Sequence, residues 1–272
     1  MDLPEKKLLQ YYPELKGLVP SQSQQDLPKV LEKVGANETS LLNGIPTVCA
    51  EEDVVQEQLD KHGFVRRDPV FSAHYSYCAR AHMVGEGTRF AEGRIDKNGQ
   101  PVDPNVSSGH SAVTGFASSG YSVVTGFALL PLHFHPFHQN AANFRYLGRQ
   151  VLNNREEYVV AFAQQPEKAE LLGSVNVNGA QITIAYQGIA WIDPDNFQVT
   201  HMRVDLLKPR PEVGTQTTEV EFSEVSLPVA AKSFWLPREA TVSRGGQDGL
   251  LREKHQFSDY KIFTKTQPAS PK

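Results

Sequence analysis

The sequence predicts a mainly β protein (α+β in detail) built on one large antiparallel sheet. Three observations support this: a long stretch of two-residue alternation, a second half made of short strand-like runs, and turn signals between those runs. The connections are too short for crossover helices, so neighbouring strands are expected to be antiparallel. The chain of 272 residues is long enough to bury a substantial core in a single unit.

Residues 1–45 are predicted to form a helical lead-in that packs on the sheet. Apolar residues from Leu27 to Val34 recur at helical spacing after Asp26. Asn37 can cap a second short helix, which Gly44 and the following proline would end. Two helices are therefore expected before the first strand, and covering the core is their simplest role.

Residues 46–263 are predicted to form the single antiparallel β domain. Its clearest strand is FSAHYSYCARAHM, in which Phe71, Tyr75, Tyr77 and Met83 share one face with small alanines. This mixture leaves room above the sheet, so these four side chains are candidate ligand-binding residues for an apolar molecule. The alternative is that the covering helices fill this space.

An irregular insertion is predicted at about 102–142, because its first part is rich in Ser, Gly and Thr without a firm period. Beyond it the chain is predicted to form a meander, with turns at Asn153-Asn154, Asn178-Gly179 and Asp193 to Asn196. Residues 264–272, TKTQPASPK, are predicted to be a disordered tail. The predicted strands of the meander are Phe144–Val151, Glu157–Ala163, Leu171–Asn176, Gln181–Tyr186, Ile189–Ile192, Gln198–Leu206, Thr218–Val225, Phe234–Val242 and Glu253–Ile262.

The histidines in HFHPFH have the only metal-like spacing in the chain. On a strand, His133 and His135 would point the same way, and His138 could return after Pro136 to complete a zinc site. No Asp, Glu or Cys lies in this segment to complete or orient such a site. Metal binding is therefore the alternative, and chance clustering of histidines is the simpler explanation; no metal or other cofactor is assigned.

Two cysteines, Cys49 and Cys78, allow one internal pairing, and each falls in a predicted strand. In an exported protein a disulfide between them is plausible, and two buried free thiols are the alternative. The chain has no hydrolase, nucleotide-binding or metalloprotease motif, so no catalytic residue is assigned and an enzyme is disfavoured.

Composition excludes several classes of partner. A formal net charge of -4 without a cluster of Lys and Arg argues against nucleic acid. No apolar run is long enough to span a bilayer. The opening MDLPEKKLLQ is not a signal peptide, so the protein is either cytoplasmic or exported with its signal removed.

The stretch IAWIDPDNFQVTHMRVD resembles the hairpin of LolA/LolB-like proteins, the outer-membrane lipoprotein carrier superfamily. FRYLGRQVLNNREEYVVAF, TTEVEFSEV, FWLPREATV and HQFSDYKIF look like uncharacterised exported bacterial proteins of the same architecture, so the resemblance covers roughly Phe144 to Phe263. It implies a curved, incomplete β-barrel with helices on its concave side, and names no catalytic residue.

Three functions follow as expectations. The first is a periplasmic or envelope binding or carrier protein for a lipid, a lipoprotein or another hydrophobic ligand. The second is an envelope module that binds or senses a protein partner through a sheet edge or a loop. The third is a metal-dependent enzyme that uses His133, His135 and His138.

Overall fold

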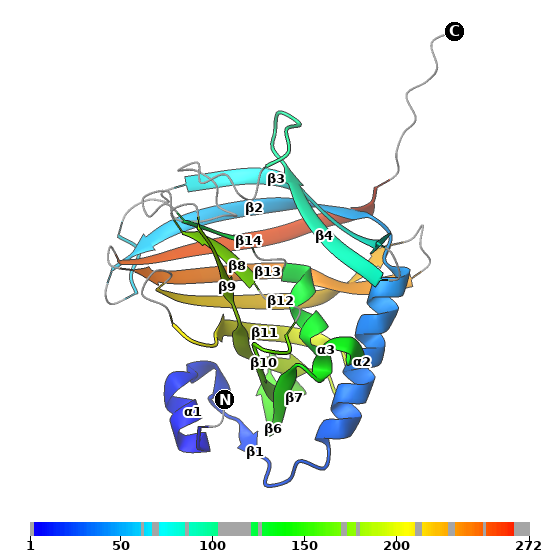
Figure 1. The fold of residues 1–272 in the computed structure, drawn as a ribbon, viewed down its shortest axis with the longest axis vertical. Coiled ribbons are helices and arrows are strands. Elements are labelled where there is room, and N and C mark those ends of the chain that lie inside the picture. The colour runs from blue at the N-terminus through cyan, green and yellow to red at the C-terminus, as the bar shows by residue number, and fades with distance from the viewer. Residues whose placement is uncertain are drawn as a thin grey trace.

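The structure is a computed structural model that describes residues 3–60, 63–66, 71–84, 87–102, 121–124, 127–169, 173–177, 180–209, 214–227, 232–246 and 249–263. Its main feature is an open, eleven-stranded antiparallel sheet (Figure 1). In spatial order, its strands are β1 (Val19–Pro20), β6 (Ala142–Leu152), β7 (Arg155–Gln164), β10 (Tyr186–Ile192), β11 (Val199–Leu206), β12 (Thr215–Leu227), β13 (Lys232–Gly246), β14 (Gly249–Ile262), β2 (Val48–Leu59), β3 (Phe71–Val84) and β4 (Gly87–Ile95).

A smaller sheet and five helical segments complete the described fold. The small sheet has three strands, in the order β5 (Tyr121–Val124), β8 (Gly173–Val177) and β9 (Ala180–Ile184). The helical segments are α1 (Glu5–Tyr11), the 3-10 turn η1 (Pro13–Leu15), α2 (Leu27–Gly44), the 3-10 segment η2 (Phe127–Phe134) and α3 (Pro136–Gln139). The predicted fold class is confirmed: the protein is mainly β, and its large antiparallel sheet is not closed into a barrel.

The large sheet buries both of its faces in the region of β7 and β10. On β7, Val160 and Phe162 pack into the main core with Val34 of α2. Val159 and Ala161 pack into a second core on the opposite face, with Leu8, Tyr12, Leu15, Leu147, Ile189 and Trp191. We call the face covered by α2 and η2 the inner face and the other the outer face.

The N-terminal segment therefore wraps around one edge of the sheet. α1 and η1 lie on the outer face, β1 extends the sheet beside β6, and α2 crosses to the inner face (Figure 1). Gly148 permits the contact with β1, because its φ is +136° and a Cβ there would lie 2.1 Å from the carbonyl oxygen of Val19. The lead-in thus covers both faces.

The second predicted helix does not exist as a separate element, because α2 runs unbroken from Leu27 to Gly44. Asn37 is not a cap. Its Nδ2 instead donates to the carbonyl oxygens of Asn196 at 2.9 Å and Phe197 at 2.8 Å, which ties α2 to the turn after β10. The separation of more than 150 residues between these partners hid this role from the sequence.

Part of the predicted insertion is ordered. Its last third forms η2 and α3, which contact α2 and the inner face, and residues 121–124 form β5. Residues 103–120 lie outside the described residues, as does the predicted tail at 264–272. No helix in the described part of the chain is long and apolar enough to cross a bilayer.

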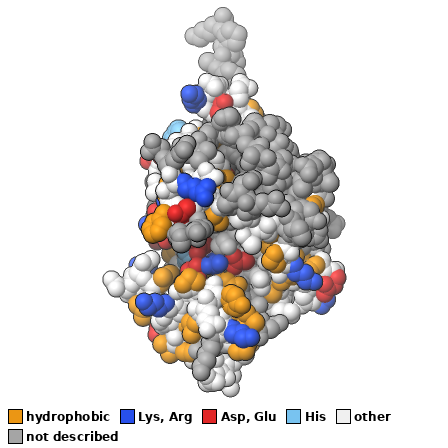
Figure 2. All heavy atoms as spheres, turned by 90° about the vertical axis from the view of Figure 1, so that its left-hand side faces the viewer, with side chains coloured by type: hydrophobic (Ala, Val, Ile, Leu, Met, Phe, Trp, Pro, Cys, Tyr) orange, Lys and Arg blue, Asp and Glu red, His pale blue; other side chains and the backbone are white. Residues whose placement is uncertain are grey.

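Figure 2 shows one side of the molecule, on which Lys and Arg side chains are scattered among acidic and hydrophobic ones. The described residues form no basic patch on this side.

Candidate functional site on the inner face

Two of the four residues that the sequence proposed for ligand binding, Tyr75 and Tyr77, lie on the inner face. Tyr77 is fully buried, and its ring lies 5.0 Å from that of Phe257 on β14. Tyr75 is also buried and packs with Val54. The side chains of Phe71 and Met83 lie outside the described residues. In this structure the two tyrosines are packed against protein, so a ligand can reach them only if their cover moves.

The sheet contributes a long apolar surface to this face. It includes Phe162, Tyr186, Ala190, Met202, Val204, Val220, Phe222, Ala240 and Val242, all buried in one continuous core. Side chains of α2 and η2, including Val30, Val34 and Phe127, cover this surface. Burial of apolar area stabilises the fold by about 25 cal/mol per Å², so the cover contributes substantially to stability.

The far end of the same face is ionic. Arg94 of β4 forms a buried bidentate pair with Glu52 of β2, with Nε–Oε2 at 2.5 Å and Nη2–Oε1 at 2.9 Å. His255 Nδ1 lies 2.9 Å from Glu52 Oε1. Burial alone would raise the pKa of Glu52, but Arg94 and His255 outweigh it and hold this pKa below its ordinary value.

The ionic cluster continues to β13. Glu253 accepts a hydrogen bond of 2.8 Å from Gln56 Nε2, and its Oε1 lies 3.7 Å from Arg244 Nη1. Both Glu253 and Arg244 are only 2% exposed. Burial also raises the pKa of Glu253. The cluster therefore joins β2, β4, β13 and β14, and it places charged groups at one end of an otherwise apolar face.

Glu92 links this cluster to the cover. Its Oε1 accepts a hydrogen bond of 2.9 Å from the backbone N–H of Ala128 in η2. Burial raises the pKa of Glu92 to about 7, although Arg94 acts in the opposite direction. Sequence reasoning missed the whole cluster, although Glu52 alternates with Ala50 and Val54 and so belongs to the inward-facing set of β2. Its partners lie on strands distant in sequence, and no local pattern connects them.

The contact between α2 and the sheet has a packing defect. Glu38 of α2 is 3% exposed, and its Oε2 has no hydrogen-bond partner among the described residues. Burial raises its pKa to about 8, so the carboxyl is mainly neutral at pH 7. It lines a pocket of about 80 Å³ between α2, η2 and the strands β11 to β13. A pocket of this size has room for a few water molecules and is smaller than a typical ligand site.

The three histidines of the metal hypothesis do not lie on a strand: His133 and His138 lie on helical elements and His135 lies between them. His133 is buried at the end of η2, with its ring 4.9 Å from that of Phe162. His135 precedes α3 and accepts a hydrogen bond from the backbone of Phe137, while His138 lies within α3. Among the described residues, no group of three or more His, Cys, Asp or Glu side chains is arranged to hold a metal ion.

Burial lowers the pKa of His133 to about 3, with a smaller contribution from His138. His133 is therefore neutral at physiological pH and packs as part of the core. His133 and His135 do not share a strand, so the geometry that would point both side chains at one metal ion is absent.

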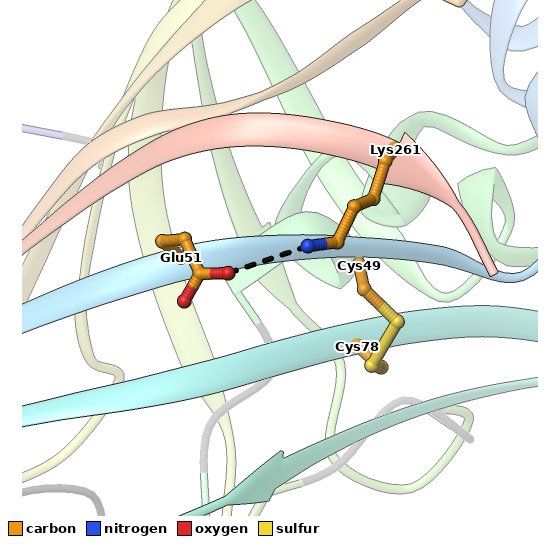
Figure 3. The surroundings of a disulfide bond; sticks show 4 residues. All are labelled: Cys49, Glu51, Cys78 and Lys261. Atoms are coloured by element: carbon orange, nitrogen blue, oxygen red, sulfur yellow. Dashed lines mark hydrogen bonds and ion pairs between the residues drawn. A yellow bond between two sulfur atoms is a disulfide. The ribbon is translucent and has the colours of Figure 1, made fainter. Parts of the chain in front are cut away.

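Cys49 and Cys78 are direct partners on β2 and β3, with their Cα atoms 4.1 Å apart and their sulfurs bonded (Figure 3). Beside them, Lys261 Nζ lies 3.4 Å from Glu51 Oε1, which links β14 to β2 on the same side (Figure 3). The bond crosslinks two neighbouring strands of the large sheet.

The turn after β10 has the local structure that its sequence predicts. Asp193 Oδ1 accepts hydrogen bonds from the backbone of Asp195 at 2.8 Å and Asn196 at 3.2 Å. Trp191 is fully buried on the outer face, and its Nε1 donates to Gln150 Oε1 at 3.0 Å. The turn therefore holds two elements in place: α2 on the inner face through Asn37, and the outer core through Trp191.

No family model matches the sequence, and no curated protein matches it. Among solved structures, the chain is similar to a DUF1329 family protein from Desulfovibrio piger, with a TM-score of 0.46, 7% identity and coverage of 88% of this chain and 94% of that one. It is similar to a putative outer membrane lipoprotein-sorting protein domain from Vibrio parahaemolyticus, with a TM-score of 0.43, 11% identity and coverage of 88% and 94%.

A third similar structure is the lipoprotein LppX of Mycobacterium tuberculosis, with a TM-score of 0.27, 10% identity and coverage of 88% of this chain and 99% of that one. At these TM-scores and identities, the similarities assign neither a function nor residue roles.

Proposed function

We propose that this protein is an exported binding or carrier protein for a hydrophobic ligand, such as a lipid or the acyl chains of a lipoprotein. The ligand binds the apolar inner face of the sheet after α2 has moved aside. The single observation that carries this proposal is the packing defect at Glu38, where the helix covers an extensive apolar surface but leaves a buried carboxyl oxygen without a partner.

Such a defect is costly. A buried polar group without a hydrogen bond costs about 1–3 kcal/mol, and the neighbouring pocket forfeits packing contacts. A helix that served only to complete the core would be more stable with an apolar residue at this position. A helix that must move away from the sheet to admit a ligand, and then return, needs a weak interface with the sheet.

The arrangement of charges supports an amphipathic ligand. The apolar surface would accept hydrocarbon, while Arg94, Arg244 and His255 lie at one end of the same face. The bond between Cys49 and Cys78 supports export, because disulfides persist mainly in oxidising compartments.

The test uses displacement of a fluorescent fatty acid by unlabelled lipid. Glu38→Leu fills the pocket and removes the unpartnered carboxyl, so it should hold α2 closed and weaken binding of the probe by roughly tenfold or more. Glu32→Leu is the matched control, because Glu32 is exposed on the same helix and should leave binding unchanged.

Native mass spectrometry of gently purified protein gives a second measure, since a carrier should retain lipid. If the unmodified protein binds no fatty acid and retains no lipid, the carrier function is wrong. If the probe binds equally well to both leucine variants, α2 is not the moving cover.

A further inference from the structure

The outer face contains a groove that the proposed function does not use. It has a volume of about 1190 Å³ and lies beside η1, between the turn after β6, the turn after β10 and the strands β12 and β13. Most of its lining lies on the face opposite to the one covered by α2, whereas Phe222 and Trp235 line both this groove and the pocket at Glu38.

Acidic side chains outnumber basic ones in the lining of the groove. The basic residues that line it, Arg155 and Arg238, already have acidic partners: Arg155 Nη1 lies 3.8 Å from Asp193 Oδ2, and Arg238 pairs with Glu221. The groove therefore keeps an excess of negative charge, which attracts cations.

Glu157 is the strongest indication of a ligand. This residue of β7 lines the groove, is only 3% exposed, and has an Oε2 without a hydrogen-bond partner among the described residues. Burial raises its pKa to about 7, and the nearby Asp193 carboxylate adds to the effect. A buried acceptor of this kind costs stability unless a donor arrives from outside the chain.

A second carboxyl group, Glu219 on β12, lies farther along the groove; its side chain is 32% exposed, and its Oε1 lies 3.9 Å from Arg203 Nη1. Burial raises the pKa of Glu219 on β12 to about 7, and a hydrogen bond with Glu14 of η1 raises it further. Glu14 Oε2 is also buried without a hydrogen-bond partner in the described part of the chain, although Glu14 pairs with Arg203 through its other oxygen.

The sheet order sets the distance between these two carboxyl groups. β7 and β12 are separated by β10 and β11, so the two positions lie three strand spacings apart, about 14 Å at ~4.8 Å per strand. In the register of these strands Glu219 is level with Ala161 of β7, four residues or about 13 Å along the strand from Glu157. The two positions are therefore about 20 Å apart. Trp235 also lines the groove, and indole rings attract ammonium and guanidinium groups.

We propose that this groove binds a ligand that carries two or more ammonium or guanidinium groups, with one group at Glu157 and another at Glu219. Two sources have this chemistry: an extended peptide with basic residues about six positions apart, which spans roughly 20 Å, and a free polyamine. The groove exceeds the ~300–1,000 Å³ typical of small-molecule sites. Because no described group of side chains is arranged for a metal ion, an inorganic cation is the less suitable ligand.

The experiment is calorimetric titration of the full chain at low salt with three probes: a peptide with two lysines about six residues apart, spermine, and Mg²⁺. The peptide or spermine should bind, and binding should weaken at high salt. Glu157→Gln and Glu219→Gln should each weaken binding by roughly tenfold or more, the loss expected for a hydrogen bond to a charged group. Glu167→Gln is the control, because Glu167 is an exposed carboxylate outside the groove lining.

Preference for the peptide would identify a basic segment of a partner protein, and preference for spermine would identify a polyamine. The proposal is overturned if neither probe binds, if Mg²⁺ competes as effectively as spermine, or if all three variants bind alike. Circular dichroism of each variant establishes that it is folded, and the two glutamines on different strands give independent tests.

Discussion

Arg94 and Glu52 form a bidentate ion pair that is almost completely buried on the inner face of the sheet, with side chains 6% and 0% exposed. The pair joins β4 to β2 across the tyrosine-bearing strand β3. Removing one partner of such a pair leaves an uncompensated charge in the interior, whereas removing both does not.

Arg94→Met should therefore lower the free energy of unfolding by about 3–5 kcal/mol. The double variant Arg94→Met/Glu52→Leu should lose less than the sum of the two single variants, because neither charge remains. Chemical denaturation of all four proteins measures this coupling. The exposed pair of Arg238 and Glu221 is the control, with an expected coupling of at most ~1 kcal/mol; similar couplings for both pairs would contradict the prediction.

Glu38 should make the protein less stable in alkaline solution. Its pKa rises from an ordinary 4.5 to about 8 in the folded protein, so the folded state holds the proton more tightly than the unfolded state. Stability is then full below pH 4.5 and falls as the pH rises through 8. Glu38→Gln should flatten this part of the stability profile, which thermal unfolding between pH 5 and 9 would measure; parallel curves for the two proteins would refute the assignment.

His133 should make the protein less stable in acidic solution. Its pKa falls from 6.5 to about 3 in the folded protein, so between these pH values the unfolded state binds a proton that the folded state does not bind. The corresponding stability is present above pH 6.5 and is lost as the pH falls toward 3. His133→Phe should remove most of this dependence, whereas His135→Phe should change it less, because burial lowers the pKa of this partly exposed histidine in the same direction. Urea unfolding at pH 7 and pH 4.5 provides the comparison.

The crosslink between Cys49 and Cys78 should contribute about 3 kcal/mol to stability, because it closes a loop over a sequence separation of 29. The variant Cys49→Ser/Cys78→Ser should unfold at correspondingly lower denaturant concentration. Mass spectrometry after alkylation without reductant measures the bond itself. Modification of both thiols in protein secreted to an oxidising compartment would show that the bond does not form there.

The strand pattern was predictable because it is local. Every strand expected between Phe144 and Ile262 is present, with ends displaced by a few residues. The positive φ angles of Asn153, at 50°, and Asn154, at 65°, show why an asparagine pair marks the turn after β6. Alternation likewise placed Tyr75 and Tyr77 on one buried face.

The candidate sites were predictable only in part. The tyrosines were identified from their spacing, whereas Glu52, Arg94 and His255 were not, because charged residues in strands ordinarily face solvent. Their burial depends on mutual neutralisation between strands that are adjacent in space but far apart in sequence. The groove of Glu157 and Glu219 was missed because its lining residues come from strands that are far apart in the sequence.

The sequence by itself determined the antiparallel sheet, its turns and the direction in which each strand presents its side chains, because these follow from periodicity and local backbone preference. Only the tertiary structure decided that the lead-in wraps around the edge at β6, with Leu8 on the outer face and Val34 on the inner. It also decided that the inner face is apolar at one end and ionic at the other. Strand order brings distant residues together, and no local pattern in the chain encodes that order.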